Sequence, residues 1–479
     1  MISEIFLNAE ASIAQLQIER LYHAVYGCKP TFIEDSYNHA CVIKIEHCDE
    51  RLACRLTHPL ITVVTSFPST EYTIQQVVAH TFVKAIEDCR INELPWGILT
   101  GIRPLKLYRA LVEKVGLRLA EEKLRDFYFV KDNKIQLLRT IYEVQAKVLN
   151  FNTSDIVCLY IGIPYCPSRC TYCTFPGYIA KSDAEIASFF HAMMEELQFT
   201  MDWLRNHNKK IRSVYIGGGT PTVLSLHQLE VLLQKLQSQL HDQCIEFTIE
   251  AGRADTITAD TLKLIKKYGV HRISINPQSF HDKTLREIGR NHSVEEVLQV
   301  YSMAKIGINQ INMDLILGLP NETLEDVKAT FKVIDQLRPE SLTIHTLALK
   351  TKSKLLETTD SKQFKKNAIA QEMLAYAQGW AKEQSYIPYY IYRQKNIASN
   401  LENIGYALEN QHSIYNILIM EELTSIVGVG CGAVSKLIDA TTGEIVRVAN
   451  PVNPDYYVKN IKEIMTNKVT KMAKILTKC

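Results

Sequence analysis

The pattern of hydrophobic and polar residues predicts strands followed by helices in the first part of the chain. Short apolar runs such as CVIKIEH (41–47) and ITVVTSF (61–67) are broken by turn residues, which is typical of β-strands. From Ile74, apolar residues recur three and four positions apart in VVAHTFVKAIEDC, in PLKLYRALVEKVG and between about 118 and 149, which predicts amphipathic helices. Residues 1–150 are therefore expected to form an α+β accessory domain that ends at the polar break FNTSD.

After Asp155 the pattern predicts alternating strands and helices. Six β-like runs follow one another: VCLYIGI, IRSVYIG, IEFTIEA, HRISIN, INQINMDLI and SLTIHTL. The intervals hold helical patterns such as AEIASFFHAMMEELQFTMDWL and VEEVLQVYSMAKIG. This alternation predicts right-handed βαβ crossovers and a parallel sheet. Residues 151–364 are thus expected to form an α/β partial (βα)6 barrel with its chemistry at the C-terminal ends of the strands. Residues 365–479 are expected to form a mainly helical C-terminal region.

Composition and charge narrow the class of protein. The 479 residues are 46% hydrophobic and 22% charged, which is typical of a globular protein with more than one core. The net charge of +2 gives no sign of nucleic-acid binding. MISEIFLNAEASIAQ lacks the pattern of a signal peptide, and no apolar run approaches the roughly 18 residues that span a bilayer. A cytoplasmic protein with no membrane span is expected.

Three of the twelve cysteines lie within eight residues, in IGIPYCPSRCTYCTFP. They are Cys166, Cys170 and Cys173, directly after the first predicted barrel strand. A zinc site usually needs a fourth ligand nearby, and no cysteine or histidine follows closely. A CxxC redox pair would leave Cys166 without a role. Three thiolates suit an iron–sulfur cluster in which one iron has no protein ligand, and such an iron can chelate a cofactor.

With this spacing, CxxxCxxC at the end of a barrel strand, the chain resembles the radical S-adenosylmethionine (SAM) enzymes. LYIGIPYC, GGGTPT, TIEAG, RISINPQSF, MDLILGLP and GVGCGAVS also occur in the order found in oxygen-independent coproporphyrinogen III oxidase, or coproporphyrinogen dehydrogenase. The resemblance covers about 155–350 and extends to about 440, so residues 365–479 are expected to be a coproporphyrinogen-oxidase-like domain. TGIRPLKL and YRQKNIASNLENIGY are similar to a long-N-terminus branch of that family.

The resemblance implies cofactors and the residues that hold them. The three cysteines would bind a [4Fe–4S] cluster, and SAM on the open iron would be split by one electron into methionine and a 5′-deoxyadenosyl radical. Contacts to this SAM are implied for Tyr160, Gly218, Gly219, Thr220 and Glu250, of which Glu250 is the expected catalytic residue. Contacts to a second SAM are implied for Tyr172, Gln278, Arg290 and Asp314, with Gln278 and Asp314 at strand ends. Ala348 and Val434 match apolar SAM contacts.

The implied reaction is the oxidative decarboxylation of coproporphyrinogen III to protoporphyrinogen IX. The substrate would be a small tetrapyrrole, and the partner an electron donor in the cytoplasm. Four propionates favour arginines in bidentate geometry, and the candidates are Arg103, Arg272, Arg290 and Arg393.

The chain departs from the family pattern at two places, and the second departure keeps another function open. Ala251-Gly252-Arg253 replaces an acid–proline pair after the third barrel strand, and Phe175 replaces a fourth, non-ligating cysteine. The second change also occurs in a related branch of haem chaperones, which bind and transfer haem. A haem carrier is therefore the alternative, although the long N-terminal block favours the dehydrogenase-like branch. A radical SAM enzyme with another substrate also fits, because fold alone does not choose the function.

Overall fold

The computed structural model forms two compact units. The first comprises Met1–Glu143, Asp360–Gln371 and Ile391–Glu402, and the second comprises Val144–Thr359, Glu372–Tyr390 and Asn403–Cys479. The structure describes every residue except 1–3, 27–28, 35–40, 90–93, 102, 150–154, 174, 176, 241–243, 348–366, 395–400 and 478–479. Most of the predicted break FNTSD therefore lies outside the described residues.

The first unit is built on a five-stranded sheet with the strand order β2-β1-β3-β4-β5. The strands are β1 Glu4–Leu7, β2 Thr31–Ile33, β3 Cys41–Cys48, β4 Arg51–His58 and β5 Ile61–Pro68. β1 is parallel to β2 and β3, whereas β3, β4 and β5 form antiparallel pairs. On β3, Ile43 and Ile45 are buried while Lys44 and Glu46 are exposed. One face of the sheet therefore belongs to the core.

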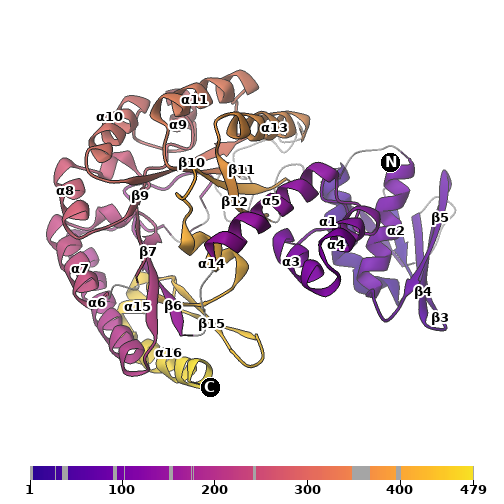
Figure 1. Cartoon of the computed structure of the whole chain (residues 1–479), viewed down its shortest axis with the longest axis horizontal. Coiled ribbons are helices and arrows are strands. Elements are labelled where there is room, and N and C mark those ends of the chain that lie inside the picture. The colour runs from indigo at the N-terminus through magenta and orange to yellow at the C-terminus, as the bar shows by residue number, and fades with distance from the viewer. Residues whose placement is uncertain are drawn as a thin grey trace. The chain divides into compact units, whose positions relative to one another are not determined.

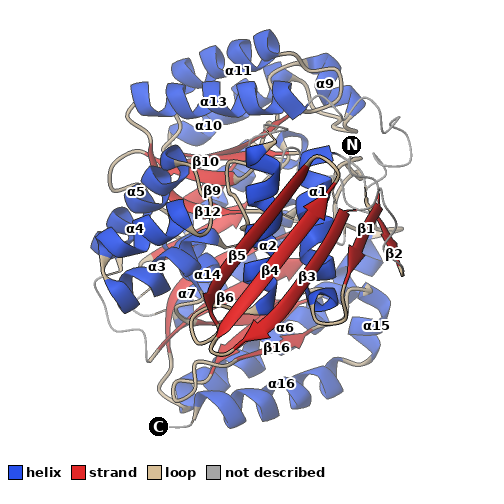
Figure 2. Cartoon of the chain, turned by 90° about the vertical axis from the view of Figure 1, so that its right-hand side faces the viewer, coloured by secondary structure: helices blue, strands red, loops and turns tan. Residues whose placement is uncertain are grey.

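This part of the chain also contains helices, of which α2 packs on the core face of the sheet. They are η1 Ala11–Ala14, α1 Gln15–Tyr26, α2 Ile74–Asp88, α3 Pro104–Val115, α4 Leu117–Asp126 and α5 Asp132–Val148. α2 packs against β4 and β5 and lies behind them in Figure 2. A capping box between Thr73 and Gln76 starts α2. The predicted α+β organisation of this part of the chain is confirmed.

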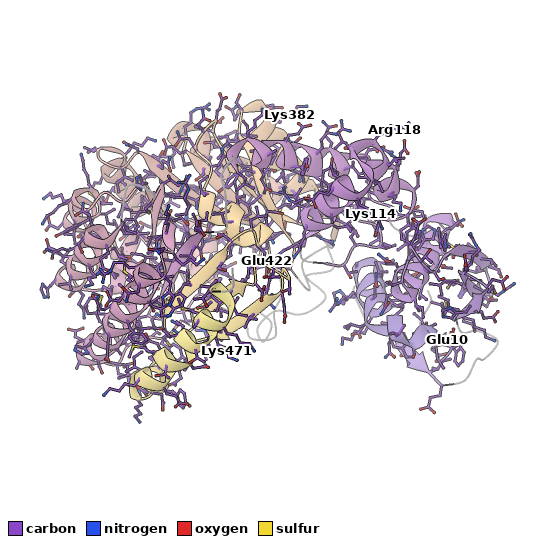
Figure 3. All side chains as sticks on the ribbon, turned by 60° about the horizontal axis from the view of Figure 1, so that its bottom comes forward. Glu10, Lys114, Arg118, Lys382, Glu422 and Lys471 are labelled. Atoms are coloured by element: carbon purple, nitrogen blue, oxygen red, sulfur yellow. The ribbon has the colours of Figure 1, made fainter. Side chains whose placement is uncertain are left out.

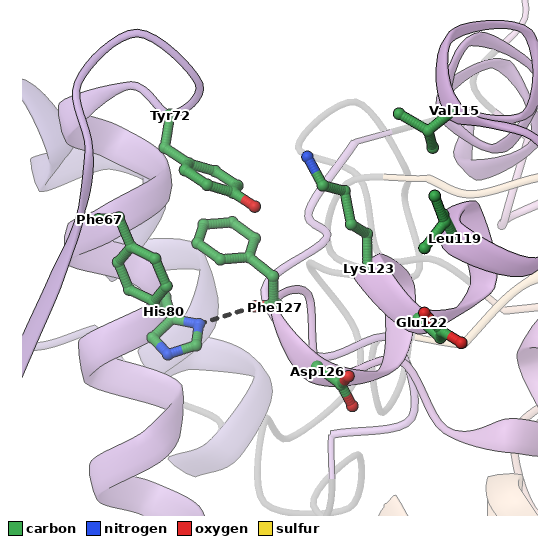
Figure 4. Close-up of a pocket in the computed structure, with 9 residues that line it drawn as sticks. All are labelled: Phe67, Tyr72, His80, Val115, Leu119, Glu122, Lys123, Asp126 and Phe127. Carbon is green, nitrogen blue, oxygen red and sulfur yellow. Dashed lines mark hydrogen bonds between the residues drawn. The ribbon is translucent and has the colours of Figure 1, made fainter.

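An aromatic cluster joins the start of α2 to the end of α4 within the first unit (Figure 4). The rings of Tyr72 and Phe127 stack with their centroids 4.0 Å apart. His80 Nδ1 lies 2.8 Å from the Phe127 carbonyl oxygen, and Lys123 Nζ lies 5.3 Å from the Tyr72 ring. These side chains, with Val115 and Leu119, line a cavity of about 470 Å³.

The second unit contains the six predicted strands as a parallel series. They are β6 Ile156–Ile163, β7 Lys210–Gly218, β8 Glu246–Glu250, β9 Arg272–Ser274, β10 Gln310–Leu317 and β11 Ser341–Thr346. The connecting helices are α6 Asp183–Asn206, α7 Leu226–Gln239, α8 Ala259–Lys267, α9 Asp282–Glu287, α10 Val294–Lys305 and α11 Leu324–Leu337. Figure 1 shows these helices along the outer side of the strands. The partial (βα)6 barrel is confirmed, and its parallel strands bring the loops after them to one rim.

Five C-terminal strands extend this sheet at both edges. β14 Ser425–Gly430 pairs parallel with β6, and β15 Val434–Ile438 and β16 Ile445–Ala449 follow it antiparallel. At the other edge, β13 Asn403–Ala407 pairs antiparallel with β11, and β12 Ile387–Tyr392 lies outermost. The helices of this region are α13 Asn367–Glu383, α14 Ile414–Glu421, α15 Pro454–Lys459 and α16 Ile461–Leu476. The sequence pattern predicted these helices better than the short strands between them.

Charged side chains face outward on the helices of both units. Lys114, Arg118, Lys382 and Lys471 are exposed and point away from the ribbon in Figure 3. Within the described part of the chain, every helix is too short or too polar to cross a lipid bilayer.

A buried ion pair fastens the C-terminal helix to the barrel. Glu196 on α6 is fully buried and accepts hydrogen bonds from Lys468 on α16 and from Tyr457 on α15. It also accepts from the Gly430 backbone N–H at 2.8 Å and from Asn450 Nδ2 at 2.9 Å. A buried charge with so many donors is tolerated only while they all remain in place.

Lys468→Met is expected to destabilise the barrel unit by about 3–5 kcal/mol, because it leaves the Glu196 carboxylate buried without a cation. Chemical unfolding followed by far-UV circular dichroism measures the loss. Lys267→Met is the matched control, since Lys267 pairs with Glu230 at the surface and its loss should barely change the midpoint. Equal midpoints for the two variants would contradict a stabilising role for the buried pair.

Candidate functional site

The three cysteines lie in a loop that leaves the end of β6 and folds back on itself. The Cys166 backbone N–H donates to the Tyr178 carbonyl oxygen at 2.9 Å, and Tyr165 forms a bridge with Tyr178. Cys170 is buried, whereas Cys166 and Cys173 are half-buried. Burial raises the pKa of the Cys173 thiol to about 11, and it also raises that of Cys166. A bound metal would be needed to hold both as thiolates near neutral pH.

The donor set suits a cluster better than a single ion. Among the described side chains, no three histidine, cysteine or acidic groups come close enough together to ligate one metal ion. In a [4Fe–4S] cluster each thiolate binds a different iron, so the three sulfur atoms stand further apart than the ligands of one ion. The positive charges of Arg253 and Arg290 act on the Cys166 thiol and favour its ionised form.

Each of three consecutive glycines at the end of β7 makes a contact that a side chain would block. A Cβ at Gly217 would lie 2.7 Å from Glu250 Oε2, and one at Gly219 would lie 2.5 Å from the Tyr165 carbonyl oxygen and 3.0 Å from Cys166 Sγ. Gly218 has a φ of 106°, which favours glycine. The next residue, Thr220, is buried with its Oγ1 3.5 Å from Cys166 Sγ. The glycine run therefore lies between the cysteine loop and Glu250.

Glu250 ends β8 with its carboxyl group partly exposed, and the positive charge of Arg290 acts on it. Burial raises the pKa of its carboxyl group to about 8, and the nearby Asp314 carboxylate adds to the rise. The Gly218 N–H and the Tyr215 hydroxyl hydrogen-bond to it and act in the opposite direction. A cationic group bound beside Glu250 would lower the cost of its charge. This is the kind of partner that the sulfonium or ammonium group of SAM supplies.

Tyrosine rings form a wall beside Glu250. Tyr160 on β6 and Tyr215 on β7 stack with centroids 6.2 Å apart, and Tyr215 stacks on Tyr415 of α14 at 4.6 Å. Burial raises the pKa of all three hydroxyl groups, and the Glu250 charge adds to the rise. Tyr160 and Tyr215 stand three residues before the ends of β6 and β7, so the stacked rings lie just inside the rim.

Arg290 connects the strand ends to the cysteine loop. It is 7% exposed and follows α9. Its Nη1 donates to the Gly252 and Asn276 carbonyl oxygens at 2.7 and 3.0 Å, and its Nη2 donates to the Tyr172 hydroxyl at 2.8 Å. Its Nε is buried without a hydrogen-bond partner in the described structure. The structure thus brings together Arg290 and Tyr172, two of the four polar residues predicted for the second SAM.

Gln278 and Asp314 meet through their backbones. The Gln278 N–H donates to the Asp314 carbonyl oxygen at 2.9 Å, and the Gln278 carbonyl accepts from the Ile316 N–H at 3.0 Å. Gln278 has a φ of 70°, and its Oε1 is buried without a hydrogen-bond partner in the described structure. A non-glycine residue with positive φ and an unused acceptor marks a strained position of the kind found at binding sites.

The position predicted for Asp314, at the end of a strand, is corrected by the structure. Asp314 stands three residues before the end of β10, because Leu315, Ile316 and Leu317 continue the pairing with β11. Its side chain accepts from Asn312 Nδ2 at 2.9 Å and lies 3.7 Å from His345 Nε2. Val434 is 39% exposed at the start of β15, and Ala348 lies outside the described residues.

The arginines proposed to bind a polyanionic substrate lie in different parts of the fold. Arg272 lies at the start of β9 and donates to Ser341 Oγ at the start of β11, so it lies at the rim opposite the cysteines. Its buried side chain at that rim does not support a contact with a substrate beside the cysteines. Arg103 and Arg393 belong to the first compact unit.

Sequence reasoning assigned no role to several residues at this rim. Tyr215 precedes the glycine run, Asn276 follows β9, and His345 lies on β11. Arg253 was noticed only as a departure from the family pattern, yet it contacts the cysteine loop through Ser168 and Cys170. Phe175, the other departure, is 64% exposed directly after Cys173 and Thr174.

Comparison with known proteins agrees with this geometry. Residues 160–334 match the radical SAM superfamily. The oxygen-independent coproporphyrinogen-III oxidase-like protein HemZ of Bacillus subtilis is 42% identical over 412 residues, which are 85% of this chain and 82% of HemZ. The heme chaperone HemW of Haemophilus influenzae is 33% identical over 40% of this chain and 51% of its own. The structure of Escherichia coli coproporphyrinogen III oxidase HemN has a TM-score of 0.53 at 20% identity, covering 67% of this chain and 72% of that one.

The chain belongs to the radical SAM enzymes and, within them, to the family of oxygen-independent coproporphyrinogen-III oxidase-like proteins. A [4Fe–4S] cluster and SAM are the cofactors of this class. The residues at the rim fit both groups, because three thiols share one loop and a partly buried carboxyl group with a raised pKa lies across the glycine run.

Cys170→Ala is expected to abolish cluster assembly and SAM cleavage, since the loop loses one of its three candidate iron ligands. Wild-type protein reconstituted without oxygen should hold about four irons per chain. Iron and sulfide analysis with a chromatographic assay for methionine checks both. Cys244→Ala, outside the loop, is the control and should keep its iron. Wild-type SAM cleavage in the Cys170 variant would show that this thiol is not a ligand.

The Glu250 carboxyl group is expected to make stability fall with rising pH in protein without SAM. Its folded pKa of about 8 lies above the ordinary glutamate value of 4.5, so the folded state binds the proton more tightly. The stabilisation is complete below about pH 4.5 and is lost as the pH rises through about 8. Thermal unfolding of wild type and Glu250→Gln across this range measures it, with the glutamine variant as the neutral reference. If the difference in unfolding midpoint between wild type and Glu250→Gln did not change with pH, the raised pKa of Glu250 would be contradicted.

Proposed function

We propose that the chain catalyses the oxygen-independent oxidative decarboxylation of coproporphyrinogen III to protoporphyrinogen IX. The observation that carries the proposal is 42% identity to an oxygen-independent coproporphyrinogen-III oxidase-like protein over 85% of this chain. Support comes from the rim, where a three-cysteine loop, a glycine run and Glu250 lie together. At each reacting propionate a hydrogen atom leaves the β-carbon, the bond to the carboxylate breaks to release CO₂, and one electron passes to an acceptor.

In this proposal Cys166, Cys170 and Cys173 hold the cluster, which together with SAM supplies the radical that removes the hydrogen atom. Glu250 accepts hydrogen bonds from SAM, and the backbone of Gly218 and Gly219 lets SAM approach the strand ends closely. The tyrosine wall of Tyr160, Tyr215 and Tyr415 keeps water away from that side. Orientation and exclusion of water are what a protein contributes to cofactor chemistry.

A second SAM, or part of the substrate, would lie at the neighbouring strand ends. Gln278 offers an unused buried acceptor, and Arg290 offers an unused Nε donor. Tyr172 receives a hydrogen bond from Arg290 and so joins this group to the cysteine loop. We assign Asp314 to the same group through its backbone bond to Gln278.

The domain roles belong to the proposal as well. Catalysis is assigned to the predicted barrel of residues 151–364, whose sheet is extended at both edges by strands β12 to β16. Residues 1–150 act as an accessory domain that has its own sheet and core. The substrate is a tetrapyrrole in the cytoplasm, and a low-potential donor supplies the electron.

The second candidate is a haem carrier, and a specific observation favours it. Phe175 is 64% exposed beside the cysteine loop, where it offers an apolar surface to a flat macrocycle. Similarity to the heme chaperone HemW, at 33% identity, covers 40% of the chain. The greater coverage by HemZ supports the enzyme.

Arg290→Ala is expected to lower vinyl formation from coproporphyrinogen by roughly 30-fold or more while iron content stays unchanged. The reason is that loss of a buried, hydrogen-bonded charge at a binding site costs on the order of 2–5 kcal/mol. Anaerobic turnover with SAM and a reductant, analysed by chromatography of the porphyrins, measures the rate. Arg286→Ala, an exposed residue of α9, is the matched control.

Haem affinity is measured on the same anaerobic preparation. The proposed enzyme makes vinyl products and binds haem weakly. Tight stoichiometric haem binding by wild type without any vinyl product would contradict the proposed enzyme activity and favour the haem carrier.

A further inference from the structure

The side chain of Arg253 is buried between a carboxylate and the cysteine loop. It is 3% exposed, and its Nη1 lies 3.7 Å from Cys170 Sγ and 3.0 Å from Ser168 Oγ. On its other edge, Nε and Nη2 donate to the two carboxylate oxygens of Asp255 at 3.0 and 2.9 Å. A guanidinium held by two parallel hydrogen bonds has a fixed plane and a fixed direction for its remaining donors.

Asp255 keeps Arg253 in this orientation. Burial alone would raise the pKa of Asp255, but His292 and Arg253 hold that pKa well below its usual range. His292 Nδ1 lies 3.7 Å from Asp255 Oδ1. The carboxylate therefore stays ionised at any pH at which the protein works, and the free edge of Arg253 faces Cys170.

We propose that Arg253 raises the reduction potential of the cluster by donating from Nη1 to the Cys170 sulfur. The inference rests on the proposed role of the three cysteines as cluster ligands. One-electron reduction makes the cluster more negative by one charge, and no bond is formed or broken. A buried cation and an N–H donor at a ligand sulfur stabilise the reduced cluster more than the oxidised one.

This role deepens the proposed function, because the electron that splits SAM must first reach the cluster. A ligand sulfur without such a donor would leave the cluster harder to reduce. Arg253 thus makes the cluster accessible to weaker electron donors than the three thiolates alone would allow. It is a tuning residue that acts through Cys170 and has no contact with the reacting carbon atoms.

A redox titration followed by electron paramagnetic resonance tests the inference on full-length reconstituted protein without SAM. Arg253→Gln removes the positive charge and most of the guanidinium N–H donors. It should lower the equilibrium constant for cluster reduction at least tenfold, which corresponds to a fall in the reduction potential of about 59 mV for one electron. Arg253→Lys keeps the charge and should lie between wild type and Arg253→Gln.

Two controls separate tuning from support of the loop. Ser168→Ala removes the hydroxyl contact of Arg253 but leaves its donor at Cys170, so the potential should stay at the wild-type value. Arg286→Gln removes an exposed positive charge from α9 and should also leave the potential unchanged. A role confined to supporting the loop predicts the reverse, namely loss of iron in both Arg253→Gln and Ser168→Ala without a shift in potential.

A second measurement remains decisive if Arg253→Gln fails to fold or to hold iron. In wild type labelled with [15N]arginine, pulsed electron paramagnetic resonance of the reduced cluster should detect a nitrogen coupling that changes with the isotope. Absence of this coupling, or an unchanged potential in a loaded Arg253 variant, overturns the inference. Failure of wild type to assemble any cluster instead overturns the proposed cluster site itself.

Discussion

The close approach of backbone to the cysteine loop is the constraint on which the rest of the site depends. A Cβ at Gly219 would lie 3.0 Å from Cys166 Sγ, and one at Gly289, whose φ is 76°, would lie 3.2 Å from the Arg169 carbonyl oxygen. Glycine is the residue that allows both contacts. Because these glycines follow β7 and α9, the loop after β6 is held by segments that come from separate βα units. The barrel therefore helps to hold the loop that carries the three thiols.

Charge is distributed around this loop in a way that suits an anionic cluster beside a cationic cofactor. Arg253 and Arg290 lie on the side of the thiols, and both donate to backbone or side chains of the loop. Glu250 on β8 and Asp314 on β10 lie on the two strands that flank β9, and burial together with the Asp314 charge raises the pKa of Glu250 to about 8. Cations beside the cluster and carboxylates beside SAM each reduce the cost of burying the opposite charge.

The sequence predicted the parts of the molecule whose signal is local. Apolar runs and helical periodicity located the six parallel strands, and the spacing of Cys166, Cys170 and Cys173 indicated the kind of cofactor. Two positions depended on non-local geometry. β10 continues past Asp314 because its last residues pair with β11. Arg272 donates to Ser341 and to the Gln411 carbonyl oxygen, and these partners come from distant segments of the chain.

The edge strands and Arg253 were missed for physical reasons too. The run SIVGVG of β14 is short and rich in glycine, so its strand character comes from pairing with β6. The contact of Arg253 with Cys170 joins residues 83 positions apart, and it depends on the turn after β8 as well as on Asp255. No local pattern in the sequence encodes such a contact.

Mössbauer spectroscopy of 57Fe-reconstituted protein, with and without SAM, tests most directly whether three cysteines hold a cluster with one open iron. Addition of SAM is expected to change the signal of one iron in four and to leave the other three unchanged, because only one iron lacks a thiolate. Four irons that respond alike, or a spectrum that SAM does not alter, would contradict an open iron at this loop.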